Sequence, residues 1–449
     1  MLRRLFSNGP IQSITAAASV VAVASLTSRF LGIFRDRVLA GEFGASETLD
    51  IYYAAFRLPD FLYTFLILGA LSAGFIPLLA AHHAKHQEKE AWDFTNLVLT
   101  TGLLVIVPLI LLLMLSAPYI IKWLIVPGFS AEDQAVTVEL SRIMFLSPFF
   151  LGLSGILSGV LQSFKRFFIY SLAPIFYNVG IIIGALYFVP KLGINGLAWG
   201  VVLGAFLHFA IQLPAVVSLG WRMKLFLRFT DKRLHELFKL MVPRTLTLLV
   251  TQANLIIITI VASHLSEGSI TVFNLANNLQ SFPIGIIGIS FAVAAFPTLS
   301  QYVAEKKHDK FIESFTKSMA EVLYFIIPIT ILIFGLRAQI VRVILGTGVF
   351  GWEATQTTLT ALGFFSLSLF AQSLIPLFTR AFFAQKDSAY PFAASIIGLL
   401  TNLGLSYYFA LEQHMGVAGL ALAFSVASIV QLFALWFGLR LRLGNLSDW

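Results

Sequence analysis

The sequence contains no cysteine. Disulfide bonds, thiolate chemistry and metal sites with cysteine ligands are therefore excluded. Charge is also scarce: Asp, Glu, Lys and Arg together make up 12% of the chain, whereas soluble globular proteins have about 25%. Hydrophobic residues account for 58%, and the mean hydropathy is +0.87. This composition predicts a chain that is embedded in a membrane from end to end.

Apolar runs of about 20 residues recur along the chain, each long enough to cross a hydrocarbon core roughly 30 Å thick as a helix. The runs do not alternate with a period of two, as the strands of a membrane barrel do. The sequence therefore predicts an all-α integral membrane protein with about 12 transmembrane helices. The predicted spans are Ala18 to Leu39, Ile51 to Leu79, Leu97 to Ser116, Ile143 to Leu161, Ile169 to Phe188, Gly196 to Val216, Leu240 to Val261, Leu279 to Leu299, Val322 to Leu336, Leu359 to Phe383, Phe392 to Phe409 and Gly416 to Leu435.

Lys and Arg are distributed unevenly among the predicted loops, and positive residues are retained on the cytoplasmic side of a membrane. With the N-terminus inside, eighteen fall in inner segments and five in outer segments. This bias predicts that both termini face the cytoplasm, and it explains most of the net charge of +8. Orientation and attraction to anionic lipid account for the basicity without a nucleic-acid partner.

The two halves of the chain match weakly but repeatedly at an offset of about 220 residues, which suggests a duplication. The four matches, in the same order in both halves, pair GFIPLL with AFPTLS, IIKWLIVPGF with IVRVILGTGVF, YNVGIII with TNLGLSY, and LGINGLAWG with MGVAGLALA. Six helices per repeat would relate the halves by an axis along the membrane normal. We expect a six-helix lobe over 1–219, a cytoplasmic linker over 220–236, and a second lobe over 237–449, arranged around a central cavity.

Ionisable residues are few inside the predicted spans, where a charge costs about 3 kcal/mol or more and normally faces a cavity or a partner. In the first span, Arg29 and Asp36 share one helical face, whereas Arg35 points away from it unless the helix bends. In the second span, Asp50 and Arg57 are two turns apart, and Asp60 follows Arg57 by three residues. These two spans hold most of the buried charge.

Two interpretations of these charges are open. Arg29 with Asp36, or Arg57 with Asp60, could form internal ion pairs that fix helix packing. Alternatively, arginines that line a partly dry cavity would bind an anionic headgroup, because the planar guanidinium suits phosphate oxygens. Arg244 and Arg380 either belong to the same cavity or extend to a membrane interface. The aspartates are also candidate ligands for a coupling ion.

Several motifs, spread over both halves, resemble those of the MurJ (MviN) family of lipid II flippases, within the multidrug/oligosaccharidyl-lipid/polysaccharide superfamily. They are SRFLGIFRD from Ser28, Asp50 before the AFRLP run at Ala55, APIFYNVG from Ala173, ANNLQSFPIGIIGI from Ala276 followed by FPTLS at Phe296, and RAFFAQKD from Arg380. The resemblance implies a transporter, not an enzyme, that carries the undecaprenyl-pyrophosphate-linked peptidoglycan precursor from the inner to the outer leaflet by alternating access. It also implies substrate-binding roles for Arg29, Arg35, Asp36 and Asp50.

The chain departs from the family pattern at three positions. Tyr63 and Asn278 stand where the family has arginines, and Leu68 replaces a family glutamate. Either Arg57, Arg244 and Arg380 supply the missing positive charge, or Asn278 and its neighbours hold the headgroup differently. The family usually has fourteen helices, of which the last two help to form a groove for the lipid tail, so twelve predicted spans leave tail binding open.

The resemblance further implies residence in the bacterial cytoplasmic membrane, with lipid II, membrane lipids and cell-wall synthesis proteins as partners. No GxxxxGK[ST] loop occurs, and no histidines are spaced as metal ligands, so we expect no catalytic residues, no metal and no cofactor. Two alternatives remain open. One is a flippase for another lipid-linked saccharide, or a drug or cation exporter of the same superfamily; the other is a non-transporting membrane scaffold.

Overall fold

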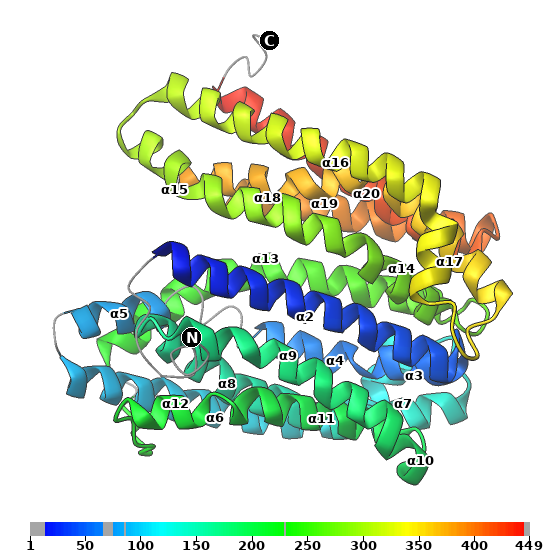
Figure 1. Ribbon diagram of the computed structural model, residues 1–449, viewed down its shortest axis with the longest axis horizontal. Coiled ribbons are helices and arrows are strands. Elements are labelled where there is room, and N and C mark those ends of the chain that lie inside the picture. The colour runs from blue at the N-terminus through cyan, green and yellow to red at the C-terminus, as the bar shows by residue number, and fades with distance from the viewer. Residues whose placement is uncertain (1–13, 66–74, 85–86, 229, 444–449) are drawn as a thin grey trace. The chain divides into compact units, whose positions relative to one another are not determined.

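The computed structural model describes residues 14–65, 75–84, 87–228 and 230–443, and the regular structure in these ranges is entirely helical (Figure 1). Eight helices in these ranges are long and apolar enough to cross a membrane. A ninth span results if α17 (Trp352–Ser366) and α18 (Leu369–Ala384), bent by 47°, count as one. The predicted all-α membrane protein is confirmed, and the number of twelve spans stays a prediction.

The chain divides into two compact units. Unit 1 comprises Met1–Leu39 and Ile51–Gln252, and unit 2 comprises Ala40–Asp50 and Ala253–Trp449. The chain therefore passes from unit 1 to unit 2 inside α13 (Lys232–Ala262), downstream of the linker expected over 220–236. The limits expected for the two lobes, 1–219 and 237–449, come from the sequence repeat and stay a prediction.

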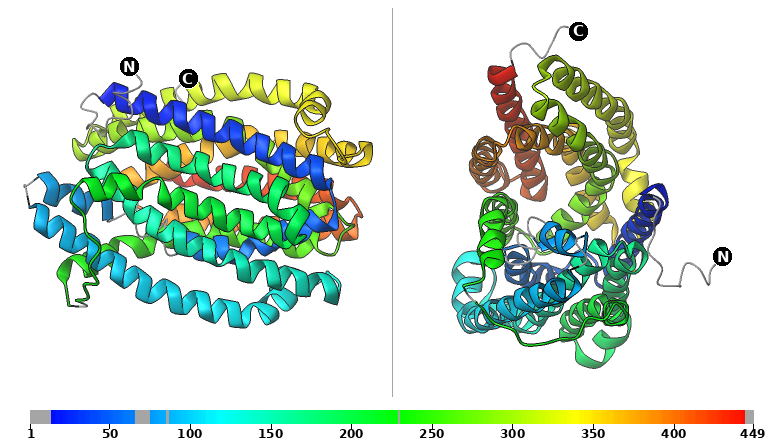
Figure 2. Two further views of the ribbon diagram at one scale, coloured as in Figure 1. Left: turned by 60° about the horizontal axis from the view of Figure 1, so that its bottom comes forward. Right: turned by 90° about the vertical axis from the view of Figure 1, so that its left-hand side faces the viewer.

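The longer helices of unit 1 run along a common direction (Figure 2). Its helices are α2 (Ile14–Phe43, as far as Leu39), α3 (Glu47–Ala55, from Ile51), α4 (Arg57–Tyr63), α5 (Ile76–Ala84), α6 (Glu88–Ile120), α7 (Ala131–Met144), α8 (Leu146–Ser163), α9 (Phe167–Ile183), α10 (Val189–Leu192), α11 (Asn195–Ala210), α12 (Leu213–Ser218) and the first part of α13, with π-helical turns η3 (Ile121–Ile125) and η4 (Gly184–Phe188). Phe75, Phe94 and Leu157 are fully buried in its apolar core.

Small residues let α9 and α11 approach backbone to backbone. A Cβ atom on Gly180 would lie 2.3 Å from the Cα atom of Gly204, and one on Gly184 would lie 2.4 Å from the Cα atom of Gly200. No side chain fits at these distances, so the spacing of four residues between glycines on both helices sets the contact. This seam holds α9 and therefore positions the side chains that α9 carries.

Unit 2 has the same all-helical construction. Its helices are the last part of α13, α14 (Ser269–Pro283), α15 (Ser290–Ala304), α16 (His308–Ile344), α17, α18, α19 (Ala389–Ser406) and α20 (Gly416–Leu443), with π-helical turns η5 (Ile284–Ile289) and η6 (Tyr407–Glu412) and the segment Ala40–Asp50. Phe311, Phe315 and Phe378 are buried in its core, with the rings of Phe315 and Phe378 edge to face, 4.9 Å apart.

Pro283, Gly285 and Gly288 suggest a broken or flexible helix, but the structure contains one continuous span over Ser269–Ala304. The irregularity is confined to the π-helical turn η5, directly after Pro283. A Cβ atom on Gly288 would lie 2.6 Å from the carbonyl oxygen of Ser373 on α18. Tight packing against α18 therefore accounts for this glycine.

Matching backbone features recur in both units at the offset of the sequence repeat. A lysine with positive φ follows α8 (Lys165, 58°) and α18 (Lys386, 61°). Likewise, π-helical turns lie before α11 and before α20. Such shared irregularities support the duplication that the four sequence matches suggest.

Candidate functional site

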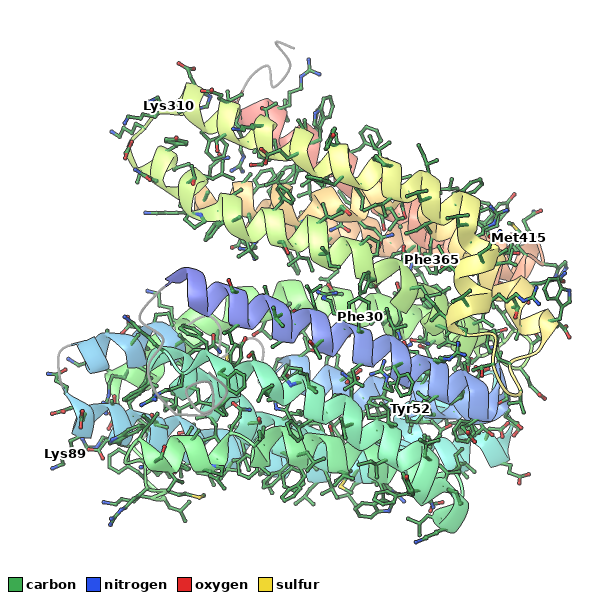
Figure 3. The ribbon with its side chains drawn as sticks, viewed as in Figure 1. Phe30, Tyr52, Lys89, Lys310, Phe365 and Met415 are labelled. Atoms are coloured by element: carbon green, nitrogen blue, oxygen red, sulfur yellow. The ribbon has the colours of Figure 1, made fainter. Side chains whose placement is uncertain are left out.

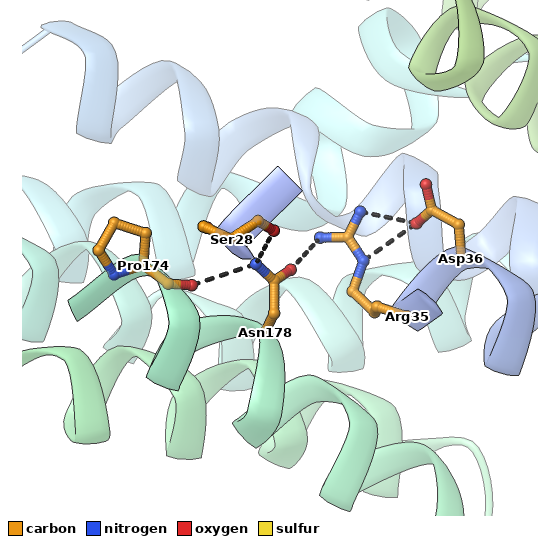
Figure 4. A network of polar contacts seen from close by, with 5 residues as sticks. All are labelled: Ser28, Arg35, Asp36, Pro174 and Asn178. Carbon is orange, nitrogen blue, oxygen red and sulfur yellow. Dashed lines mark hydrogen bonds and ion pairs between the residues drawn. The ribbon is translucent and has the colours of Figure 1, made fainter. Parts of the chain in front are cut away.

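Arg35 is the centre of a polar network inside unit 1 (Figure 4). Its Nε and Nη2 atoms donate to Oδ1 of Asp36, over 3.0 and 2.7 Å, and its Nη1 atom donates to Oδ1 of Asn178 on α9, over 3.1 Å. The amide nitrogen of Asn178 donates to the carbonyl oxygens of Pro174 and Ser28, over 3.1 and 3.5 Å. Asn178 therefore links α2 to α9 and fixes the plane of the Arg35 guanidinium.

A second pair of charges and four tyrosines surround this network. Arg57, at the first residue of α4, is 8% exposed and interacts electrostatically with Asp60 and Tyr53. Asp60 in turn interacts with Arg35, and its backbone carbonyl accepts a hydrogen bond from Gln252 over 3.1 Å. The tyrosines near these charges are Tyr52, Tyr53, Tyr63 and Tyr177. Tyr52, labelled in Figure 3, is 2% exposed.

Arg29 differs from Arg35, although both lie on α2. Arg29 is partly exposed and makes no hydrogen bond or ion pair with the residues that the structure describes. The pairing of Arg29 with Asp36, one of the two interpretations of the sequence, is wrong because the neighbouring Arg35 binds Asp36. On α2, Arg35 is thus held in place, whereas Arg29 has no acceptor among the described residues.

Asp50 lies on α3 in the part that belongs to unit 2, and its carboxylate reaches the start of α14. Its Oδ2 atom accepts from the backbone nitrogen of Gly268 over 2.8 Å, and its Oδ1 atom accepts from the backbone nitrogen and hydroxyl of Thr271, over 2.7 and 2.6 Å. A carboxylate at this place satisfies amide groups that have no partner within the helix and complements the helix dipole. At 3% exposed, Asp50 is a helix cap supplied from a distant part of the chain.

Unit 2 contains amides where unit 1 has charges. Asn278 lies on α14 beside Asn277, whose Oδ1 atom accepts from Gln280 over 3.0 Å. Gln372 on α18 continues the chain of hydrogen bonds by donating to Gln280 over 2.9 Å and to Ser368 over 2.8 Å. Asn278 therefore lies next to a chain of amide hydrogen bonds that runs from Asn277 to Gln372.

Arg380 and Arg244 are the remaining predicted site residues. Arg380 lies on α18 with its guanidinium over the ring of Phe296, 5.6 Å from the centroid. It is eight residues, about 12 Å, beyond Gln372. Arg244 lies on α13, but its side chain is outside what the structure describes, as is the whole of Leu68.

Asn178 and the tyrosines are the functional candidates that the charge pattern does not reveal. One sequence signal does point to Asn178, since it is the asparagine of YNVGIII and pairs with Asn402 of TNLGLSY in the repeat. The tyrosines carry no such signal because aromatic residues are common in this chain, at 14%. Among the described residues, no group of three or more His, Asp or Glu could hold a metal ion.

Comparisons with known proteins agree with this architecture. The model of the family "Lipid II flippase MurJ" matches residues 39–448. A probable lipid II flippase MurJ of Rhizobium tropici is 30% identical over 92% of this chain and 79% of its own length. A solved lipid II flippase MurJ in an inward closed conformation is 29% identical and superposes with a TM-score of 0.80 over 94% of this chain and 87% of that one.

A multidrug resistance MATE family transporter of the MOP superfamily, in an inward-facing conformation, shares the fold. Its TM-score is 0.78 over 96% of this chain and 98% of that one, and the sequence identity is 15%. Because the family model covers most of the chain and the identity to the Rhizobium relative extends over nearly all of it, the assignment does not depend on a single motif. The chain belongs to the lipid II flippase MurJ family.

Proposed function

We propose that this protein is a lipid II flippase that carries the undecaprenyl-pyrophosphate-linked peptidoglycan precursor from the inner to the outer leaflet of the bacterial inner membrane by alternating access. Both termini face the cytoplasm in this proposal. The single observation that carries the residue assignment is the contrast on α2 between Arg35, held by Asp36 and Asn178, and Arg29, whose donors have no acceptor among the described residues. Family membership supplies the substrate class.

In the proposed mechanism, the pyrophosphate of the headgroup approaches Arg29 first. A permanently charged, planar group in a site of low water content binds phosphate oxygens through charge-assisted hydrogen bonds. Arg35 contributes positive potential from a fixed place, because Asp36 and Asn178 already use three of its donors. Release on the other side follows when the two halves of the transporter exchange access, while the lipid tail stays in the bilayer.

Asp50 has a positioning role in this proposal. Both of its oxygen atoms are engaged at the start of α14, so they are not available to a cation. Arg57 and Asp60 set the electrostatic surroundings of Arg35 inside unit 1. Asn278 and Arg380 would contact the uncharged sugar and the outer part of the headgroup, since the face around Asn278 offers amides.

The experiment that tests the function is replacement of the flippase in living bacteria. The chain is expressed in cells depleted of their own lipid II flippase, and survival is followed together with the appearance of lipid II in the outer leaflet. We expect rescue by the parent chain, loss with Arg29→Ala, and only partial recovery with Arg29→Lys, because Lys keeps the charge but lacks the planar fork. Arg142→Ala, on α7, is the control, since that side chain donates to the carbonyl of Met114 in a largely exposed setting.

Two outcomes would contradict the proposal. Transport that survives Arg29→Ala in a correctly inserted protein would remove the arginine from substrate binding. A parent chain that inserts but moves no lipid II would favour a flippase for another lipid-linked saccharide. That second candidate has one specific observation behind it: Tyr63 and Asn278 leave the positions of two family arginines uncharged.

A further inference from the structure

A cavity of about 290 Å³ lies at one end of unit 2, where the α15–α16 turn, the end of α18 and the last turn of α20 meet. Its lining includes Tyr302, Lys306, His308, Phe311, Gln385 and Arg442. Lys310 marks this end of the unit in Figure 3, and Met415 marks the opposite end. Three candidate spans end or begin here, at Ala304, His308 and Leu443, so the cavity lies where these spans end.

Arg442 is held in a fixed orientation at the cavity. Its guanidinium lies over the rings of Phe382 and Tyr390, 5.4 and 5.8 Å from their centroids, and these rings stack on each other at 4.9 Å. Its Nη2 atom is 2.5 Å from Oδ2 of Asp387. The Nε and Nη1 donors have no acceptor among the described residues. A guanidinium already fixed in this way loses little freedom when it binds an oxyanion.

Of the two cations that line the cavity, Arg442 is paired with Asp387, whereas Lys306 has no carboxylate partner among the described residues. Asp387 accepts from the backbone nitrogens of Ala389 and Tyr390, over 2.8 and 3.2 Å, in addition to Arg442. Glu305 pairs with Lys307 over 2.6 Å and accepts from Gln301 over 2.7 Å. The hydrogen bond from Lys307 lowers the pKa of the Glu305 carboxyl below its usual value, so Glu305 stays ionised and paired.

Lys306 is the second cation of the cavity. Its φ of 56° places it in the left-handed region at the end of α15, a position that glycine usually takes. His308 opens α16 beside it, and its Nε2 atom lies 3.2 Å from the carbonyl oxygen of Leu443 on α20. This contact ties the turn to the end of α20, so Lys306 and Arg442 line one site from two directions.

The turn after α8 in unit 1 carries an aromatic residue where the turn after α18 carries Gln385. Phe164 precedes the left-handed Lys165 just as Gln385 precedes the left-handed Lys386. The ring of Phe164 stacks on Trp92 of α6, with centroids 5.2 Å apart and planes 7° apart. At this turn position, unit 2 therefore has a polar side chain that lines a cavity, whereas unit 1 has a stacked aromatic ring.

We propose that this cavity in unit 2 binds the anion of a phosphate ester, through Arg442 and Lys306, with Gln385 and Tyr302 as further polar contacts. An anionic phospholipid headgroup and a soluble phosphate ester share this chemistry. Basic pockets at the ends of transmembrane helices are typical sites for anionic headgroups. The inference does not depend on the proposed transport function.

The test uses the purified full-length chain in detergent and measures how added ligand shifts the thermal unfolding temperature. The probes are phosphatidylglycerol, phosphatidylcholine with the same acyl chains, and glycerol 3-phosphate. The decisive variant is Gln385→Phe, which places the aromatic side chain of the Phe164 position at the cavity while leaving every charge in place. The matched control is Lys165→Gly, which removes a positive charge from an equivalent left-handed turn outside the cavity.

We expect phosphatidylglycerol to stabilise the parent chain more than phosphatidylcholine does, with an apparent affinity that falls about tenfold in Gln385→Phe and is unchanged in Lys165→Gly. Lys306→Gly should weaken binding as well, without strain because glycine favours this φ. Stabilisation by glycerol 3-phosphate, lost in Gln385→Phe, would identify a soluble ester as the source; its absence would identify the lipid. Equal responses to both lipids without any response to glycerol 3-phosphate would overturn the proposal, as would full binding by Gln385→Phe and Lys306→Gly that unfold at the parent temperature.

Discussion

Asn178 accepts a hydrogen bond from Arg35 over 3.1 Å and so joins α9 to α2 inside unit 1. The asparagine at the matching place in unit 2, Asn402 of α19, instead donates to Oδ1 of Asn254 on α13 over 2.6 Å. Both units thus use one buried amide to join two helices, but only unit 1 joins it to a charge. The asparagine that joins two helices is thus present in both units, but its partner is a charged arginine in unit 1 and a neutral asparagine in unit 2.

Replacing Asn178 by Leu should lower the free energy of unfolding by about 1–3 kcal/mol, because the half-buried Arg35 loses an acceptor. Thermal unfolding of the purified protein measures this change. Gly32→Ala is the control, since the added methyl group would lie 3.9 Å from Asn178 Oδ1, an ordinary contact. A variant as stable as the parent would show that the hydrogen bond does not hold α2 against α9.

Substitutions of Arg29 and Arg35, both on α2, should distinguish an effect on stability from an effect on transport. Arg35→Gln breaks the bonds to Asp36 and is expected to lower the unfolding temperature, since it leaves a buried carboxylate without its cation. Arg29→Gln should leave the unfolding temperature unchanged and reduce lipid II translocation at least tenfold, as loss of a charge-assisted contact would. Unfolding and translocation assays on the same preparations decide between these roles. A destabilised Arg29→Gln would mean that Arg29 serves packing instead.

The close contact between α9 and α11 at Gly180 gives a prediction that can be compared with the equivalent glycine of unit 2. Gly180→Ala places a methyl group 2.3 Å from the backbone of Gly204, where nothing flexible can yield, and should lower the free energy of unfolding by about 1–3 kcal/mol. Gly404, its counterpart in the repeat, has nothing within 4 Å of the added atom. Gly404→Ala should therefore leave the protein unchanged, or stabilise it by about 0.5–1 kcal/mol because alanine favours a helix. Equal effects of the two substitutions would show that the close packing at Gly180 does not contribute to stability.

Asp50→Ala should loosen the start of α14. The backbone nitrogens of Gly268 and Thr271 lose their acceptor, at an expected cost of about 2 kcal/mol. Hydrogen exchange gives a local measurement: peptides covering the start of α14 should exchange faster, whereas α7, capped by its own Ser130, should not change. Unaltered exchange at α14 would leave substrate binding as the better explanation for this acid.

The helices could be predicted from the sequence because hydropathy is a local property. Each predicted span falls on a helix, a pair of helices or, for Ile51 to Leu79, on helices that flank residues outside the description. The partners of Asp36 and Asp50 could not be predicted. A helical wheel places Arg29 on the face of Asp36, but the flexible side chain of Arg35 reaches its direct neighbour instead.

The cap on α14 shows a second limit. Asp50 binds residues 218 and 221 positions away, and no periodicity in the sequence reports a contact at that separation. The repeat carries such information only where both copies keep the same residue, as at Asn178 and Asn402. Gln385 and Phe164 differ, so the repeat gives no signal for the cavity in unit 2.

The segment Ala40–Asp50 belongs to unit 2, while the residues on both sides of it belong to unit 1. During synthesis the ribosome delivers this segment about two hundred residues before Gly268 and Thr271 exist. The residues from Ala253 onward therefore do not contain all of unit 2. A fragment that begins at Ala253 would lack Asp50, whose carboxylate caps the start of α14. The segment Ala40–Asp50 must therefore remain without these hydrogen-bond partners until Gly268 and Thr271 have been synthesised.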